Sequence, residues 1–411
     1  MAETAIVIGA GITGVAAAEW LRRDGVRVTL VDRIDPGSDG QTSYGNAGLL
    51  ARSAVLPLSE PGMMWTALKM LADRDSPLFL KWRYLPRLAP WMLPFLMNGQ
   101  TRRMMPIVDA LTSIVTDSVD QHEALAKGTK AERFLRRGPY SYIFRDRAEY
   151  EHHALDWAMR RRAGFKVAEL DREDLTRLDP HLADRYGFAA RLEDHGWLTD
   201  PGRYVAALAQ HFTDQGGRFV KAEVADIAAG RVILADGSDL RADKIVLAAG
   251  VWSGALARRL KQKAMIESER GYHLVLKEPS FMPAHPFMVA EASFVVTPMD
   301  RGLRCAGIVE FGGLKAPMSL APVNLLKKRI AQVYPGLTWA SEETWMGHRP
   351  STPDSLPHIG ALAENPDIVF AFGAQHIGLT LGPRMGRMAA DIIAGRRPNI
   401  DLAPFRPERF R

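Results

Sequence analysis

The pattern that most constrains this chain lies near its N-terminus, where an apolar run leads directly into closely spaced glycines. The run Ala5–Ile8 predicts a strand, a GxGxxG turn and a helix come next, and a second apolar run ends at Asp32. Gly9 permits a tight turn, Gly11 lets the backbone approach a pyrophosphate, and Gly14 lets the helix pack closely on the strand. The helix N-terminus presents N–H groups to phosphates, and Asp32 can accept hydrogen bonds from a ribose diol. A glycine-rich turn in an ordinary βαβ unit is the alternative, but the combined spacing favours a dinucleotide site.

Composition and charge narrow the remaining function classes. The 411 residues allow two or three domains, and the net charge of +6 reflects 53 basic against 47 acidic residues. The basic residues are scattered, so nucleic-acid binding is not supported, and the excess fits anionic substrates or lipid headgroups. Cys305 is the single cysteine and is predicted to be a buried structural thiol, so we expect neither a disulfide nor a metal site. No signal-peptide pattern or long apolar stretch occurs, so we expect an intracellular, cytoplasmic protein.

The alternation of elements predicts a nucleotide-binding domain built from separate stretches and interrupted by a second domain. We expect helices at 108–127, 148–163 and 204–215, strands at 140–144, 218–224, 244–250 and 370–373, and a C-terminal helix running from near Pro383 to 394. Residues 57–106 are rich in Pro, Met and Trp and predict short helices broken by proline. The nucleotide-binding domain is expected to comprise 1–56, 147–257 and 345–411, and the substrate domain 57–146 and 258–344.

Two further glycine-containing loops favour a flavin over a nicotinamide. Only one GxGxxG occurs, which argues against a separate pyridine-nucleotide domain. Ala248-Ala249-Gly250 ends a predicted strand and offers a second close backbone approach to a nucleotide. Gly373, Gly378, Gly382 and Gly386 form a third set, and Pro383 suits a first helical turn. That helix start can direct its positive end at the pyrimidine edge of a flavin.

These loops and several more specific motifs resemble a known family. The motifs are Gly9–Gly14 with Asp32, residues 42–48, 248–253, 270–272, 347–354 and 375–382. Together they resemble the FAD-dependent oxidoreductases of the D-amino-acid oxidase and glycine oxidase superfamily. Within it the chain looks most like bacterial D-amino-acid dehydrogenases, including the D-hydroxyproline dehydrogenase branch. The resemblance implies an α/β fold, with a Rossmann-like FAD-binding domain and a second domain containing a mixed, largely antiparallel sheet.

The resemblance also implies which residues contact the cofactor. FAD is expected to be non-covalent, because Cys305 lies outside the flavin loops. The expected FAD contacts are Gly9, Gly11, Ile12, Thr13, Gly14, Asp32, Arg33, Thr42, Ser43, Asn46, Ala47, Gly48, Val224, Ala249, Gly250, Trp252, Gly373, His376, Ile377, Gly378, Leu379 and Thr380.

The expected reaction is hydride transfer from the α-carbon of an amino acid to the flavin. Arg349 matches the family position for binding the substrate carboxylate, and a guanidinium suits bidentate binding. Tyr272 is a second candidate for that carboxylate, although core packing is an equal alternative. His376 is expected near the reactive face of the flavin, and Tyr44 replaces a small or apolar residue and is expected to alter the pocket. The 375–380 loop favours a compact cyclic amine such as D-proline or cis-4-hydroxy-D-proline.

The electron acceptor and the partners are less constrained by the sequence. Trp65, Trp82 and Trp91 within residues 61–97 predict an apolar surface for a quinone or for the inner face of the cytoplasmic membrane, or else a cover over the active site. The resemblance favours a dehydrogenase that passes electrons to a quinone or another protein, as a homo- or hetero-oligomer. The alternatives are an oxidase of glycine or N-methyl amino acids that uses O2, a 2-hydroxy-acid dehydrogenase, and an FAD-binding subunit without its own turnover.

Overall fold

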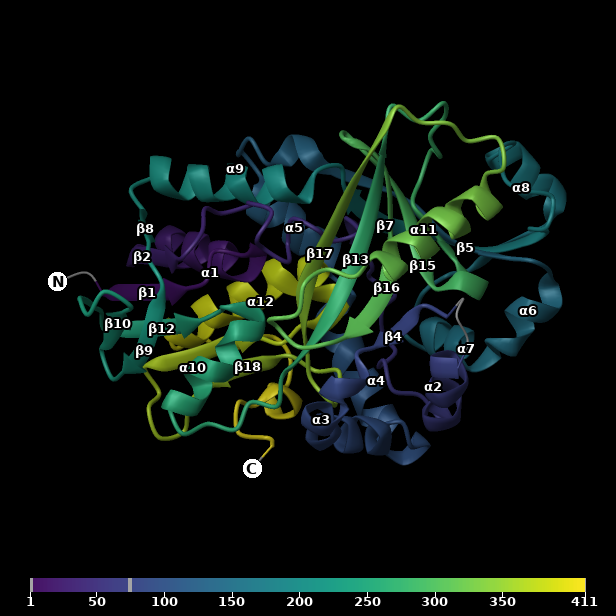
Figure 1. Ribbon diagram of the computed structural model, residues 1–411. Coiled ribbons are helices and arrows are strands. Elements are labelled where there is room, and N and C mark those ends of the chain that lie inside the picture. The colour runs from purple at the N-terminus through teal and green to yellow at the C-terminus, as the bar shows by residue number, and fades with distance from the viewer. Residues whose placement is uncertain (1–2, 73–75, 411) are drawn as a thin grey trace.

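The computed structural model describes residues 3–72 and 76–410, which are organised around two sheets (Figure 1). The first sheet has the strand order β18-β19-β12-β1-β2-β8 and is parallel except for its edge strand β18. In that order the strands span His358–Ala361, Ile368–Phe372, Lys244–Leu247, Thr4–Ile8, Arg27–Asp32 and Arg218–Lys221.

Strand β1 shows why this sheet is covered on both faces. Ala5 and Val7 pack in one core with helices α1, α5, α9 and α12, whereas Ile6 and Ile8 pack in another with α10 and a small sheet of β9, β10 and β11. An apolar run without alternation is typical of a parallel strand buried on both sides. The helices span Ile12–Arg23, Ser118–Ala126, Pro201–Asp214, Gly378–Ile393 and Ser253–Arg259, and the small sheet Val224–Ala228, Arg231–Leu234 and Asp239–Arg241.

The second sheet is mixed and largely antiparallel. Its order is β17-β13-β16-β15-β14-β5-β7-β3, with β4 added beside β16 and β6 beside β7. Its parallel pairs are β14 with β5 and β4 with β16. In the order given, the strands span Ser341–Ser351, Glu267–Lys277, Gly302–Phe311, Phe294–Met299, Phe287–Val289, Leu135–Phe144, Phe188–Leu198, Leu49–Leu50, Leu78–Leu80 and Ala168–Leu170.

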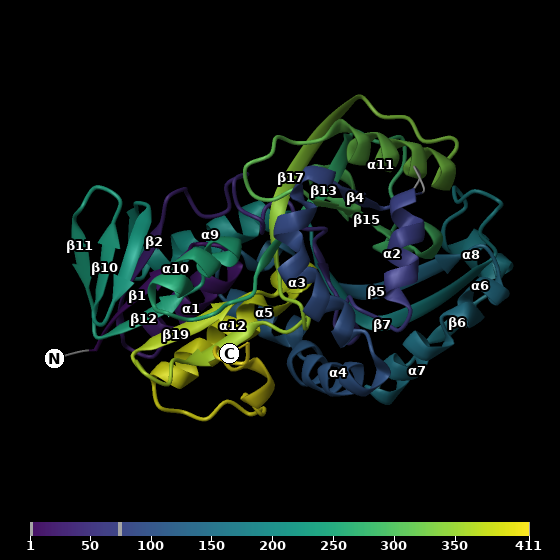
Figure 2. The same cartoon turned by 60° about the horizontal axis from the view of Figure 1, so that its bottom comes forward.

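Different helices lie on the two sides of this second sheet (Figure 2). Helix α11, Leu320–Val333, packs on β13 and β16 from the outside, and its apolar side chains join their core. Helices α2 and α3, Met63–Ala72 and Leu85–Asn98, lie on the opposite side. The remaining α-helices α4, α6, α7 and α8 span Thr101–Val115, Arg147–His152, Ala154–Arg162 and Arg172–Leu178. Among the described residues, no helix is long and apolar enough to cross a membrane.

The predicted fold class is confirmed, but several predicted boundaries are wrong. The helix expected at 108–127 is interrupted between α4 and α5. Asp117 lies at this break, where its carboxylate accepts a hydrogen bond from Gln121 and forms an ion pair with Arg384. The helix expected at 148–163 is likewise split at His153 into α6 and α7. The strand expected at 218–224 is divided between β8 and β9, which belong to different sheets.

The expected role of proline needs correction, and one strand crosses the expected domain division. Strand β7 pairs with β5 in the second sheet, although residues 147–257 were assigned to the nucleotide-binding domain. Pro90 and Pro94 lie inside α3 and do not end it. With Pro86 they recur every fourth residue, so the missing N–H groups fall along one side of the helix.

Candidate active site

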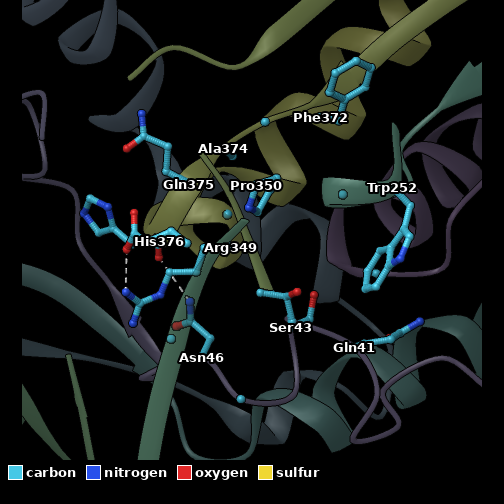
Figure 3. Close-up of a pocket in the computed structure, with 18 of the residues that line it drawn as sticks. Gln41, Ser43, Asn46, Trp252, Arg349, Pro350, Phe372, Ala374, Gln375 and His376 are labelled. Carbon is cyan, nitrogen blue, oxygen red and sulfur yellow. Dashed lines mark hydrogen bonds and ion pairs between the residues drawn. The ribbon is translucent and has the colours of Figure 1, made fainter. Parts of the chain in front are cut away.

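A cavity of about 800 Å³ extends from the carboxyl ends of the first sheet to the inner face of the second. Figure 3 shows Trp252 and Gln41 towards one end of it and Arg349 and His376 towards the other. In parallel α/β sheets this edge is where ligands bind, because the connecting loops and helix N-termini converge there. The Trp252 end is called the nucleotide end below, and the Arg349 end the substrate end.

Glycine sterics shape the nucleotide end. Gly9 has φ of +101°, and a Cβ at this position would lie 2.5 Å from the Ala248 carbonyl oxygen. A Cβ on Gly14 would lie 1.7 Å from the Gly9 carbonyl oxygen, so the close contact between helix and strand requires glycine. Helix α1 starts after Gly11 without a capping side chain at that residue, and the Ile12 N–H donates to Ser43 Oγ at 3.1 Å. The predicted glycine turn is therefore present at the cavity wall.

Asp32 ends β2 at the same end of the cavity. Its Oδ2 accepts a hydrogen bond from the Ala10 N–H at 2.7 Å and another from Gln41 Nε2 at 3.2 Å. These donors fix the carboxylate beside the glycine turn. Arg33, next in the chain, lies over the Trp252 ring at 4.4 Å from its centroid, and both side chains line the cavity.

Most predicted cofactor residues line this cavity. Those that do so are Gly9, Gly11, Ile12, Thr13, Asp32, Arg33, Thr42, Ser43, Asn46, Ala47, Val224, Ala249, Gly250, Trp252, Gly373, His376, Gly378 and Leu379. The predicted residues absent from its lining are Gly14, Gly48, Ile377 and Thr380. Of these, Thr380 donates through Oγ1 to the Leu49 carbonyl at 3.3 Å.

A second helix N-terminus reaches the cavity at α12. The helix begins at Gly378, directly after the 3₁₀ helix Gln375–Ile377, and Gly378 and Leu379 at its start line the cavity. The predicted start near Pro383 is wrong, because this proline lies inside the helix. Proline supplies no N–H to the Leu379 carbonyl, and His122 Nε2 donates to that carbonyl at 2.9 Å instead.

At the substrate end, a buried ion pair joins two neighbouring strands. Glu269 on β13 and Arg349 on β17 are direct cross-strand partners, and Arg349 Nη1 donates to Glu269 Oε1 at 2.7 Å. Ser351 Oγ donates to the other carboxylate oxygen at 2.9 Å. The guanidinium lies against the Gly271 backbone, where an added Cβ would come within 2.5 Å of Arg349 Nε. Glycine at this position therefore allows the guanidinium to lie flat along the cavity wall.

The protonation states of Glu269 and His376 at the substrate end follow from their surroundings. Burial alone would raise the pKa of Glu269, but Arg349, His376 and the hydrogen bond from Ser351 outweigh it and hold the pKa below its ordinary value. His376 is exposed to the cavity, yet the enclosing protein removes most bulk water around it. This desolvation lowers the pKa of His376 to about 4, assisted by Arg349 and opposed by Glu269. At neutral pH the end therefore holds one cation, one anion and a neutral histidine.

The comparison with known proteins agrees with this geometry. Residues 4–392 match the family model described as FAD dependent oxidoreductase, the DAO family. The chain belongs to this family. It is 36% identical over 413 residues to a D-amino-acid oxidase of Bradyrhizobium diazoefficiens, and the match covers 98% of each chain. It is 29% identical to a D-amino acid dehydrogenase of Dechloromonas aromatica, covering 97% of this chain and 99% of the other. The glycine oxidase structure from Geobacillus kaustophilus superposes with a TM-score of 0.72 at 20% identity, covering 100% of both chains.

The residues of this DAO-family member fit FAD. The Gly9 turn and the α1 N-terminus can hold the pyrophosphate, and Asp32 the ribose, while the α12 N-terminus faces the far end of the same cavity. Cys305 is buried within β16 and does not line the cavity. Within the described residues, no group of three His, Cys, Asp or Glu side chains could hold a metal ion.

Tyr272 does not reach the cavity, contrary to the prediction of a carboxylate ligand. Side chains alternate along β13, so Glu269 and Gly271 face the cavity while Tyr272 faces α11. Its hydroxyl donates to Glu310 at 2.7 Å and accepts from the Ser319 N–H at 3.2 Å. The core-packing alternative is therefore the correct one.

Tyr44 also lies outside the cavity lining. Its hydroxyl donates to Glu343 at 2.8 Å and accepts from Arg301, and its ring packs on Gly202. It stabilises the junction of the loop at residues 42–48 with the second sheet and does not form the pocket wall. Glu269 and Gly271, by contrast, were not predicted as site residues, and Glu269 is placed opposite Arg349 by the pairing of β13 with β17.

Proposed function

We propose that this protein oxidises a D-amino acid with an apolar side chain to the corresponding imino acid. FAD-dependent oxidation of amino acids follows from family membership. The observation that supports the finer assignment is the position of Arg349 in the cavity wall, where apolar side chains from α2, α3 and the second sheet also line the cavity. The D configuration is supported by the names of the relatives, which include a D-amino-acid oxidase and D-amino acid dehydrogenases.

The chain's own residues would hold and orient the substrate. The Arg349 guanidinium would bind the α-carboxylate, and the support from Gly271 and Glu269 fixes its plane. FAD, when bound, supplies the acceptor for the hydride that leaves the α-carbon. The α-ammonium group also loses one proton as the C=N bond forms, and the chain's residues orient the Cα–H bond and exclude water.

The wall around Arg349 supports an apolar side chain on the substrate. It is formed by residues from α2, α3 and the second sheet. These include Met63, Ala67, Met70, Leu78, Met92, Phe95, Leu96, Met288, Val295, Val309 and Phe311. A hydroxyl group facing these residues would lose hydrogen bonds to water, so we favour apolar substrates over the hydroxyproline suggested by the sequence.

Anaerobic reduction of the bound flavin tests this proposal. The purified holoenzyme would be mixed with D-phenylalanine, D-leucine, D-alanine, D-proline, hydroxy-D-proline, glycine, sarcosine, L-phenylalanine and D-lactate. We expect loss of the oxidised flavin absorbance with apolar D-amino acids at lower concentration than with the others. Reduction by D-lactate alone would indicate a 2-hydroxy-acid dehydrogenase, and no reduction by any amino acid would overturn the proposal.

We further propose that the electrons pass to a quinone at an anionic membrane surface. Side chains from α2 and α3 line the cavity on one side. On the outer surface, three large apolar side chains are exposed at 66%, 63% and 64%: Trp65 on α2, Trp82 on the short 3₁₀ helix Trp82–Tyr84, and Leu93 on α3. Residues 76–108 contain five basic and no acidic residues. Exposed aromatic side chains among cations are typical of a surface that binds anionic lipid.

Vesicle sedimentation and product analysis separate this proposal from an oxidase. We expect the holoenzyme to sediment with phosphatidylglycerol vesicles and not with phosphatidylcholine vesicles, and Trp82→Ser to weaken binding more than the control Leu155→Ser, an exposed apolar residue on α7. A soluble quinone should re-oxidise the flavin faster than O2 does. Stoichiometric hydrogen peroxide in air, with no vesicle binding, would favour the O2-dependent alternative.

A further inference from the structure

The Glu269 carboxylate is a charged group at the substrate end that supports Arg349 but cannot itself bind a substrate carboxylate. It is 4% exposed, lines the cavity, and keeps its pKa below the ordinary value. A buried carboxylate is costly unless it is paired, and here the cost is met by Arg349 and Ser351. Its location beside the proposed carboxylate ligand suggests a function beyond support.

The carboxylate has capacity for another donor. An ionised carboxylate offers about four acceptor sites, and each Glu269 oxygen receives one protein hydrogen bond, from Arg349 and from Ser351. Because the guanidinium and the carboxylate are 2.7 Å apart, a substrate carboxylate on Arg349 brings its α-substituent next to Glu269. An ammonium group is the substituent whose charge and N–H donors match this position.

The balance of charges at the substrate end also favours an ammonium group next to Glu269. Arg349 and Glu269 carry opposite charges, and His376 is neutral at pH 7 because its pKa lies near 4. A substrate with a carboxylate alone would add an uncompensated negative charge to this enclosed end. A zwitterionic amino acid adds one charge of each sign and leaves the end neutral.

We propose that Glu269 binds the α-ammonium group of the substrate while Arg349 binds its carboxylate. This inference rests on the proposed amino-acid oxidation. It means that the cross-strand pair recognises the zwitterion itself, and selects amino acids over carboxylic and 2-hydroxy acids of the same shape. The apolar chamber then receives the side chain.

The experiment compares an amino acid with the same molecule lacking its amine. Wild-type, Glu269→Gln and Glu267→Gln holoenzymes would be titrated anaerobically with D-phenylalanine, following flavin reduction, and with 3-phenylpropanoate, following perturbation of the flavin spectrum. Glu267 is a matched control, since it lies on the same strand, is buried, binds Tyr84 and does not line the cavity. FAD content would be measured for each variant.

We expect Glu269→Gln to weaken the binding of the ligand that carries an amine and not of the ligand that lacks it. Glu269→Gln should weaken D-phenylalanine binding about tenfold or more, as for loss of a charge-assisted hydrogen bond, and leave 3-phenylpropanoate binding unchanged or tighter. Equal weakening of both ligands would overturn the inference, because Glu269 would then act only by positioning Arg349. No change in either would also overturn it. Failure of wild-type enzyme to be reduced by D-phenylalanine would count against the proposed substrate and is visible before any variant is made.

Discussion

At the scale of single residues, the proposed substrate binding depends on the geometry of Arg349. Lysine at this position keeps the positive charge beside Glu269 but presents a compact ammonium with rotatable donors in place of a planar fork. We expect Arg349→Lys to raise KM for the best D-amino acid by about tenfold, and Arg349→Ala by about a hundredfold, since a hydrogen bond to a charged group contributes roughly 1.5–3 kcal/mol. Steady-state kinetics with FAD content as the control would check this, and an unchanged KM would remove Arg349 from carboxylate binding.

A second prediction at this scale concerns Gly271, because this residue determines where the Arg349 guanidinium lies. A methyl group at this position would meet Arg349 Nε, Cζ and Nη2 at 2.5–2.8 Å. The clash is with the end of a flexible side chain, so Gly271→Ala should fold and retain FAD while displacing the guanidinium. We expect a rise in KM of about tenfold, with little change in melting temperature. Gly14→Ala provides the contrast, because its clash is with the Gly9 backbone and should abolish FAD retention.

At the scale of elements, helix α12 depends on a histidine from another helix. Pro383 leaves the Leu379 carbonyl without its N–H partner, and His122 of α5 supplies the hydrogen bond while Tyr204 of α9 contacts its other ring nitrogen at 2.9 Å. We expect His122→Ala to lower the free energy of unfolding by about 2–4 kcal/mol.

Adding Pro383→Ala to that variant should restore about 1 kcal/mol, since alanine supplies the missing N–H. Chemical denaturation of the two single variants and the double variant would measure this coupling. Strict additivity would show that His122 stabilises α12 in another way.

The same element shows where sequence reasoning succeeded and where it failed. The positions of Gly9, Gly11 and Gly14 could be predicted from their spacing, and two of them are required by the geometry of the turn itself, because Gly9 has a positive φ and Gly14 contacts the Gly9 carbonyl. The start of α12 could not be predicted, because the proline inside this helix leaves a carbonyl that a distant side chain, His122, binds. That partner is more than two hundred residues away in the chain.

The substrate end illustrates the same limit on β13. Motif position suggested Tyr272, whereas strand alternation decides that Glu269 and Gly271 face the cavity. Without a register for β13 against β17, the sequence offers no means of choosing the face. Arg349 and His376 were predicted from motifs that are specific, and the structure places both at one end of the cavity.

At the scale of the whole molecule, burial of neutral histidines makes stability depend on pH. Burial lowers the pKa of His122 and His348 to about 4 and of His195 to about 3. Between pH 6.5 and 4 the unfolded chain therefore binds protons that the folded protein does not, so the free energy of unfolding falls as the pH falls. For His122, which is fully buried, the effect is on the order of 3 kcal/mol across this window.

Glu60 has the opposite effect on the pH dependence of the free energy of unfolding, but it is one group against three histidines. Its pKa is raised to about 7 by burial and by Asp156, so between pH 7 and 4.5 the folded protein binds a proton that the unfolded chain lacks. The sum of three histidines and one carboxyl group still favours unfolding in acid. We expect the denaturation midpoint of the holoenzyme, followed by tryptophan fluorescence, to decrease steadily from pH 7 to pH 4.5.

The slope of the denaturation midpoint against pH in two variants assigns the loss of stability in acid to particular groups. His122→Gln removes one titrating ring and keeps a donor near the Leu379 carbonyl, so its midpoint should change less with pH than that of the wild type. Glu60→Gln removes the opposing carboxyl group, so its midpoint should fall more steeply. A midpoint that is flat or rises towards pH 4.5 in the wild type would mean that the histidines are not buried in the neutral form, and would contradict the packing of α5, α9 and α12 around His122.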